Sequence, residues 1–108
     1  MFDKRDLGEV NTWLAMALAR EGKNAEAAQT IEPVVKFQRA LATRNHGDRW
    51  LPQELAAALY AQALIDTKHG AELLHEAATL MDGLPGAIKN LHDVRQWQTK
   101  IQQARTKP

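Results

Sequence analysis

The feature that most constrains the fold of this chain is an internal similarity between two alanine- and leucine-rich segments that lie 46 positions apart. Identical residues recur at that offset, and most of the pairs beside them are apolar in both copies. A fixed offset is typical of helical repeat architectures, in which one unit is stacked on its copy. The identical positions are Ala15, Ala17, Leu18, Ala25 and Glu26 in the first copy and Ala61, Ala63, Leu64, Ala71 and Glu72 in the second.

The positions of glycine and proline between the apolar stretches predict an all-α domain of about five helices. No segment alternates apolar and polar residues over the length of a strand, whereas long segments show helical periodicity between the breakers. The first expected helix covers 6–21, and the second runs from 25 to the loop at 44–48. The third begins between 48 and 52 and ends at 68. The fourth covers 71–82, and the fifth covers 91–105. We therefore expect two antiparallel helical hairpins, 6–45 and 50–83, closed by a capping helix at 90–105.

Individual residues predict where these helices turn. Gly22 suits the left-handed position that follows the end of a helix, and Asn24 is the expected cap of the next helix. Pro33 lacks an amide hydrogen and crowds the preceding turn, so a kink or a break is expected there. Gly70 marks the expected turn of the second hairpin, and Asn90 is a candidate cap for the last helix.

Apolar residues at helical spacing define the face that each helix is expected to bury. In the first helix the expected stripe is Leu7, Val10, Leu14, Ala17 and Leu18, widened by Trp13. In the second helix the expected stripe is Ala27, Ala28, Ile31, Val34, Val35, Gln38 and Leu41, and in the third it is Leu55, Ala58, Leu59, Ala63 and Leu64. In the fourth helix it is Leu73, Leu74, Ala77, Leu80 and Met81. In the last helix it is Leu91, Val94, Trp97, Ile101 and Ala104. Trp13 and Trp97 are thus expected in the core, whereas Trp50, beside a proline turn, is a candidate exposed anchor.

Length, charge and cysteine content exclude several classes of protein. The 108 residues support one domain, 1–108, and a formal net charge of +1 argues against a dedicated nucleic-acid binder. The absence of cysteine excludes a disulfide scaffold and a thiol nucleophile. No apolar run approaches the roughly 20 residues that span a membrane, and the first residues lack the apolar segment of a signal peptide. These features favour a cytoplasmic domain without a membrane partner.

The candidate residues for catalysis or metal binding are sparse. Asp66 and His69, and likewise Glu72 and His75, lie one helical turn apart, as in the carboxylate-bridged di-metal bundles. Both pairs flank a single turn, however, and the other helices offer no matching inward acids, so solvated side chains are expected and no metal. The chain has no serine, no glycine-rich phosphate loop and no nucleophile motif. We expect neither an enzyme nor a cofactor.

Part of the first hairpin resembles a tetratricopeptide repeat (TPR), whose spacing is matched by Leu14, Ala15, Leu18, Gly22, Ala27 and Ile31. The second hairpin matches less well, because its glycine is displaced to Gly70 and Leu73 stands where the family has a small residue. Pro85 follows where the family has its closing proline, although the spacing of the two units exceeds the usual repeat length. From 84 to 101 the chain looks like the end of TPR-like C-terminal regions of bacterial signalling proteins, including Ser/Thr kinases and transcription regulators.

The resemblance implies a non-catalytic module that binds a protein or peptide on a concave face, built mainly from the first helix of each hairpin. The candidate partner-binding residues are Glu9, Thr12, Met16 and Arg20 on the first helix, Arg49 and Trp50 in the loop, and Glu54, Gln62 and Asp66 on the third helix. The family's clamp of lysine and asparagine for a free C-terminus is not evident.

Three alternatives remain open at this stage. The domain can self-associate as a homodimer through an exposed apolar helix face, because two repeats are fewer than such stacks usually need. It can be the regulatory tail of a larger bacterial signalling protein. The basic residues Lys36, Arg39, Arg44 and Arg49 can form a patch for an acidic partner, but nearby acids favour a mixed, solvated surface, and nucleic acid is not an expected partner.

Overall fold

The computed structural model describes residues 4–44 and 50–106, with side chains from residue 7 onward. These residues form helices and no strand, so the all-α class is confirmed. The elements are α1 (Lys4–Arg20), α2 (Asn24–Arg44), α3 (Leu51–Ile65), a 3₁₀ turn η1 (Thr67–His69), α4 (Gly70–Asp82), α5 (Gly86–Lys89) and α6 (His92–Thr106). The five long helices agree with the expected ones, and the short α5 was not expected.

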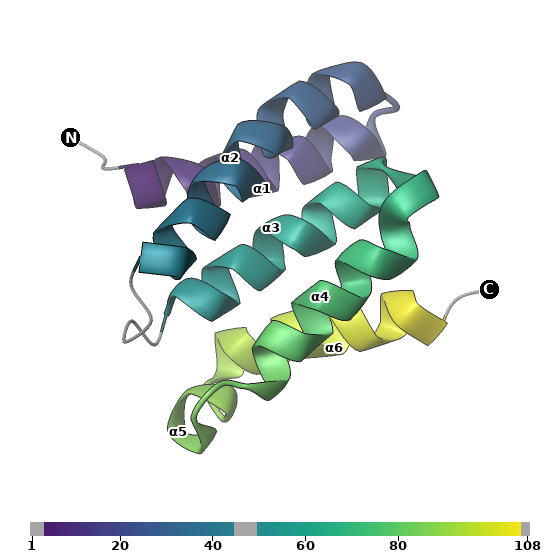
Figure 1. Cartoon of the computed structure of the whole chain (residues 1–108). Helices are drawn as coiled ribbons and strands as arrows, with labels where there is room; N and C mark the ends of the chain where they lie inside the picture. The colour runs from purple at the N-terminus through teal and green to yellow at the C-terminus, as the bar shows by residue number, and fades with distance from the viewer. Residues whose placement is uncertain (1–3, 45–49, 107–108) are drawn as a thin grey trace.

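The helices form two antiparallel hairpins, α1–α2 and α3–α4, with α6 packed against the second hairpin (Figure 1). α3 is the central element, because it contacts α1, α2, α4 and α6. α1, α3 and α6 run in one direction, and α2 and α4 run in the other (Figure 1). The first helix of each hairpin and the last helix therefore present their starting turns at the same end of the molecule.

The first hairpin turns at Gly22, whose φ of 79° confirms the predicted left-handed conformation. The backbone N–H groups of Gly22 and Lys23 donate to carbonyls in the last turn of α1, at 3.0 and 2.9 Å. These are the two hydrogen bonds of the Schellman motif. The prediction that Asn24 caps α2 is wrong by one position. The helix begins at Asn24, and the carbonyl of Lys23 accepts the first helical bond, from the N–H of Ala27 at 2.9 Å.

Of the kink or break expected at Pro33, the break does not occur, because α2 runs through this residue from Asn24 to Arg44. Pro33 is exposed, and so is Gln29, four residues earlier, whose carbonyl lacks the usual helical donor. Buried residues on both sides of the proline, among them Ile31 and Val35, hold the helix against its neighbours. Packing therefore outweighs the loss of one solvent-facing hydrogen bond.

The second hairpin turns differently from the first. α3 ends at Ile65 rather than 68, and the side chain of Asp66 accepts a hydrogen bond from the backbone N–H of His69 at 3.3 Å. Gly70, the expected turn glycine, is buried and has the helical φ and ψ of −56° and −45°. The turn predicted at His69 and Gly70 therefore lies slightly earlier, at Asp66–His69, where an aspartate cap reverses the chain without a left-handed residue.

The segment after α4 differs from its prediction at Asn90, the expected cap of the last helix. α4 ends at Asp82, as expected from the glycine and proline that follow. Asn90 follows the last residue of α5, Lys89, and does not cap α6. The carbonyl of Leu91 instead accepts the first helical bond of α6, from the N–H of Arg95 at 3.0 Å. The extra turn of α5 shifts the start of the last helix by one position.

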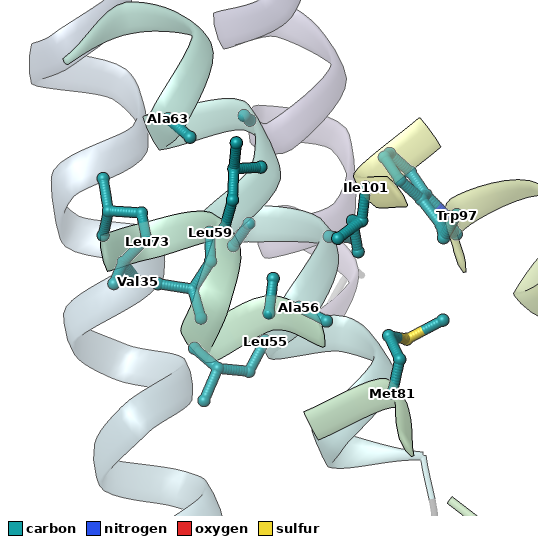
Figure 2. Close-up of a cluster of buried hydrophobic side chains, with 14 of the residues drawn as sticks. Val35, Leu55, Ala56, Leu59, Ala63, Leu73, Met81, Trp97 and Ile101 are labelled. Carbon is teal, nitrogen blue, oxygen red and sulfur yellow. The ribbon is translucent and has the colours of Figure 1, made fainter. Parts of the chain in front are cut away.

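The core is centred on α3 and confirms most of the expected stripes of α2, α3, α4 and α6 (Figure 2). Leu55 and Leu59 of α3 lie among Val35 of α2, Leu73 of α4 and Ile101 of α6, all buried (Figure 2). α3 buries residues on nearly all sides because helices surround it. Exceptions are Leu64 and Leu91, which are exposed, and the partly buried Ala28, Leu41, Leu80 and Ala104. None of the helices in the described parts of the chain is both long and apolar enough to cross a membrane.

The buried face of α1 is not the one that periodicity predicts. Leu7, Val10 and Leu14 are 46%, 53% and 47% exposed, Ala17 is exposed, and Leu18 is only partly buried. We call Leu7, Val10, Leu14 and Ala17 the α1 stripe. The face turned inward instead carries Gly8, Thr12, Ala15 and Met16, all of which are buried.

Close contact between the backbones of α1 and α2 explains this choice of face. A Cβ atom added at Gly8 would lie 3.2 Å from Nε2 of Gln38 and 3.6 Å from Cγ1 of Val34. Small residues fit in that space, whereas the leucines of the α1 stripe would force the helices apart. The larger side chains therefore face outward, where no helix of the described chain covers them.

Candidate functional site

A hollow of about 620 Å³ opens between α1, α3 and α6, and we call it the three-helix hollow. Its size is in the range of pockets that hold small molecules or a few residues of a peptide. The lining residues are Gly8, Glu9, Thr12 and Trp13 of α1, Gln38 of α2, Trp50, Gln53, Glu54 and Ala57 at the start of α3, and Leu91, His92, Asp93, Val94, Gln96, Trp97 and Lys100 around α6.

Two tryptophans in the wall of this hollow contact each other. The ring centroids of Trp13 and Trp97 lie 5.1 Å apart with an interplanar angle of 44°, and Tyr60 contacts Trp97 edge-on at 5.8 Å. Trp97 is buried, as predicted, but Trp13 is 47% exposed, so its predicted core position is wrong. The Nζ atom of Lys100 lies 5.6 Å from the centroid of each indole, which is within the range of a cation–π contact.

Polar groups form the deeper part of the hollow. Gln38 is 2% exposed, and its Oε1 atom is buried without a hydrogen-bond partner among the described residues. Thr12 is also buried, and its hydroxyl donates to the carbonyl of Gly8 at 2.8 Å. Because buried polar atoms are nearly always hydrogen-bonded, an enclosed Oε1 atom without a partner is an unusual feature of the packing around α2. Sequence periodicity placed Gln38 on a buried stripe, and a glutamine there was the available signal of a site.

The structure brings four of the nine predicted partner-binding residues together. Glu9, Thr12, Trp50 and Glu54 line the three-helix hollow, and Trp50 is exposed as expected for an anchor. As candidate partner-binding residues, Thr12 and Met16 were expected to point away from the packed face of α1; this expectation is wrong, because both are buried on the side of α1 that faces inward.

The other predicted residues lie elsewhere. Met16 belongs to the core and is only 5% exposed, so it cannot contact a partner. Arg20 is exposed at the end of α1, outside the hollow. Gln62 and Asp66 line a second hollow of about 540 Å³ between α2 and α3. Arg49 lies outside the described residues. The sequence missed Trp13, Trp97 and Gln38 as site residues because each fits an apolar helix stripe.

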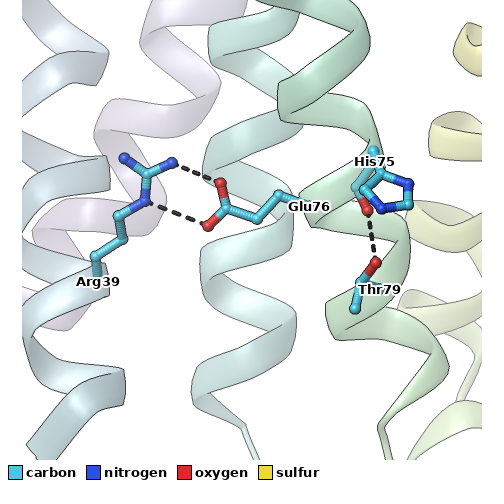
Figure 3. A network of polar contacts seen from close by, with 4 residues as sticks. All are labelled: Arg39, His75, Glu76 and Thr79. Carbon is cyan, nitrogen blue, oxygen red and sulfur yellow. Dashed lines mark hydrogen bonds and ion pairs between the residues drawn. The ribbon is translucent and has the colours of Figure 1, made fainter.

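The expected basic patch is partly neutralised. Arg39 forms two hydrogen bonds with the carboxylate of Glu76, from Nη2 at 2.6 Å and from Nε at 3.3 Å (Figure 3). This ion pair links α2 to α4 beside the ribbon of α3 (Figure 3). Lys36 and Arg39 also line the second hollow together with Glu32 and Asp66. That hollow is therefore of mixed charge, as expected of a solvated surface.

The two acid–histidine pairs do not form a metal centre. The ring of His69 contacts Asp66, with Nδ1 2.9 Å from Oδ2. This hydrogen bond lowers the pKa of the Asp66 carboxyl below 3.8 and raises the pKa of His69 above 6.5. Within 4–44 and 50–106, no three histidine or acid side chains are arranged to hold a metal ion. In the second pair, Glu72 and His75 are both exposed on α4, and the backbone carbonyl of His75 accepts a hydrogen bond from Thr79 at 2.9 Å (Figure 3).

Comparison of the chain with protein-family models, with curated proteins and with solved structures finds no match. Functional conclusions therefore depend on the residues and the geometry of the three-helix hollow.

Proposed function

We propose that this chain is a non-catalytic, TPR-like interaction module of the cytoplasm that binds a segment of another protein in the three-helix hollow. The observation that carries the proposal is the half-exposed Trp13, in tilted ring contact with the buried Trp97 at the wall of a hollow of about 620 Å³. A tryptophan in this position supplies a large, rigid contact area, and such residues often dominate binding energy at protein interfaces.

The placement of the hollow also supports this function. It lies on the first helices of the two hairpins and on the last helix, α6, which are the elements whose starting turns share one end of the molecule. The resemblance of Leu14, Leu18 and Gly22 to the TPR pattern implies peptide binding on that same side of a helical stack. The lining combines exposed apolar groups with polar groups of fixed position, as peptide-binding grooves do.

Selection from a displayed peptide library tests this proposal. Peptides selected on the wild-type protein should lose most of their affinity for the Trp13→Ser variant, by roughly 2 kcal/mol or more if Trp13 is an anchor. The matched control is Leu64→Ser, because Leu64 is similarly exposed, at 44%, but lies outside the hollow. Equal loss with both variants, or no peptide at all, would count against a binding groove.

A second candidate function is self-association through the α1 stripe, in the manner of a homodimer or of a tail within a larger bacterial signalling protein. At the offset of 46 positions, Val10, Trp13 and Ala17 correspond to Ala56, Leu59 and Ala63 of α3, all buried. Other helices cover these positions on α3, but no further hairpin of the described chain covers the corresponding positions on α1. Open apolar surface of this kind favours association.

Sedimentation equilibrium distinguishes this candidate from the first. Self-association predicts a mass that doubles with concentration for the wild type and stays at 12.1 kDa for Leu14→Lys. The control is Leu64→Lys, which should leave the dimer intact. A monomer at all concentrations would remove the candidate and leave the groove function untouched.

A further inference from the structure

We propose that the three-helix hollow binds a proline-rich segment of the partner in the polyproline II conformation, with two prolines three residues apart against Trp50 and Trp13. This inference rests on the proposed function, because it names the chemistry of the ligand for that same site. It combines three observations: all tryptophans of the chain line one hollow, two exposed indoles have a particular spacing, and the lining carries charges of both signs.

The tryptophans of this chain converge on the hollow from three elements. The chain has three of them, and all three line the hollow, Trp13 on α1, Trp50 at the start of α3 and Trp97 on α6. Trp13 and Trp50 are each 47% exposed, whereas Trp97 is buried. Two half-exposed indoles leave a large, rigid apolar area in water, which is typical of a binding surface.

The two half-exposed indoles lie at opposite ends of the hollow. Trp50 is the N-cap of α3 and its first lining residue, whereas Trp13 is the last lining residue of α1. Because α1 and α3 run in the same direction, these positions are the starting end and the far end of the hollow (Figure 1). The lining of α3 extends from Trp50 to Ala57, which is about 10 Å along the helix axis.

The polyproline II conformation matches this length. It has three residues per turn and a rise of about 3.1 Å, so residues three apart share a face at a distance of about 9.3 Å. In a β-strand, residues on one face are about 6.8 Å or 13.6 Å apart. A stretch of α-helix 10 Å long and 10 Å across occupies roughly 800 Å³, more than the hollow of about 620 Å³.

The indole rings offer proline a surface that is already organised. Trp97 is held between Trp13, at 5.1 Å between ring centroids, and Tyr60, at 5.8 Å. Proline-rich segments dock in aromatic-lined grooves of this kind, because their conformation is preformed and little entropy is lost on binding. The carbonyls of such a segment have no internal hydrogen bonds, so they can accept from the N–H groups of indoles.

The charges of the lining favour a neutral ligand. The Nζ atom of Lys100 lies 5.6 Å from the centroids of both Trp13 and Trp97, so a cation of the protein itself already occupies this place. Glu54 and Asp93, in the first turns of α3 and α6, would repel an acidic segment from the starting end. A proline segment avoids both conflicts, since it has neither a charge nor, at its prolines, an N–H group that needs an acceptor.

Isothermal titration calorimetry of the full chain with short blocked peptides tests the inference. Each peptide has two prolines in a background of alanine and glutamine, separated by one, two or three residues, and a fourth peptide has leucine in place of both prolines at the middle spacing. We expect the peptide with two intervening residues to bind at least about fivefold more tightly than the other three. Equal affinity for all spacings, or tighter binding of the leucine peptide, would overturn the inference.

Variants of Trp50 connect this preference to the hollow. Trp50→Ala removes one aromatic face and should weaken binding at least about tenfold, whereas Trp50→Phe keeps a ring and should retain most of the affinity. The side chain of Trp50 makes no capping hydrogen bond, so the midpoint of thermal unfolding should change little in either variant. Leu64→Ser, an exposed change outside the hollow, is the control and should have no effect.

The outcomes separate this inference from the proposed function. If library peptides that depend on Trp13 contain no prolines and the proline peptides do not bind, the groove function stands and this inference fails. If the proline peptides bind but are unaffected by Trp50→Ala and by Trp13→Ser, their site lies elsewhere and the inference also fails. If neither the library nor the proline peptides bind, both proposals fail.

Discussion

At the scale of single residues, the geometry of the chain depends on a few side chains at its turns. Gly22 takes a left-handed conformation that other residues adopt only with strain, whereas the second hairpin uses the carboxylate of Asp66 for the same reversal. Two turns with the same topological role thus have different chemistry. One depends on a missing Cβ atom, and the other depends on the charge of an aspartate and a histidine.

Replacement of Gly22 by alanine should lower the free energy of unfolding by about 1 kcal/mol, because a Cβ atom strains the left-handed conformation. No atom lies within 4 Å of that Cβ position, so the effect would come from the backbone alone. Urea denaturation measures it. Gly83→Ala is the control, because Gly83 has a helical φ of −80° and should change stability little. An equal loss for both variants would contradict the backbone explanation.

The Asp66–His69 hydrogen bond should make stability depend on pH. A raised histidine pKa stabilises the fold fully below 6.5, and this contribution is lost as pH rises through the folded value. A lowered aspartate pKa stabilises the fold fully above 3.8, and this contribution is lost as pH falls through the folded value. The contribution is therefore complete between pH 3.8 and 6.5 and declines on both sides.

The free energy of unfolding of wild type and of His69→Gln, measured from acid to alkaline pH, checks this window. The difference between the two proteins should be largest inside the window and should shrink outside it. His92→Gln is the matched control, because the ring of His92 contacts the amide of Gln96 on α6 rather than a carboxylate. A difference that does not vary with pH would rule out the ion pair as its cause.

At the scale of elements, α1 shows how packing selects one of two possible faces of a helix. Its apolar residues are spaced for burial, but the inward face carries Gly8, Thr12 and Ala15, which allow α2 to approach closely. α2 and α4 show a second element-scale effect, because the Arg39–Glu76 ion pair joins two helices that both pack against α3.

Alanine substitutions distinguish the two faces of α1. Met16→Ala should lower the free energy of unfolding by about 2–5 kcal/mol, because it leaves a cavity in the core. Leu14→Ala should lower it by less than about 1 kcal/mol in the monomer, since half of that side chain is exposed. Chemical denaturation at low protein concentration measures both values. The apolar periodicity of the sequence predicts the reverse order, so a larger effect at Leu14 would mean that the inward face is wrongly assigned.

The Arg39–Glu76 ion pair should contribute about 0.5 kcal/mol, because both side chains are largely exposed, at 49% and 40%. A double-mutant cycle with Arg39→Gln and Glu76→Gln isolates the coupling energy of the pair. Repetition in about 1 M salt should reduce the coupling, since exposed charges are screened. A coupling energy of zero at low salt would show that the contact between α2 and α4 is not stabilising.

At the scale of the whole molecule, the sequence predicts the fold better than the site. Breakers such as Gly22 and Gly83 fix the helices to within a few residues, and periodicity identifies the buried stripes of α2, α3, α4 and α6. Periodicity fails for α1, because the choice between its faces depends on how closely another helix approaches. It also fails for the three-helix hollow, because no local pattern reveals that Trp13 meets Trp97 and that Gln38 reaches the same space.

The two outer surfaces of the helical stack have opposite character, and this asymmetry limits the kind of assembly the chain can form. The α1 stripe is apolar, whereas the exposed side of α6 carries Arg95, Gln96, Thr99, Gln102, Gln103 and Arg105. A head-to-tail contact, which builds a ring or an open filament, would press one against the other and would bury polar groups against leucines. A two-fold contact of stripe against stripe closes after two copies. If the chain self-associates as proposed, the polar last helix would therefore disfavour fibre growth.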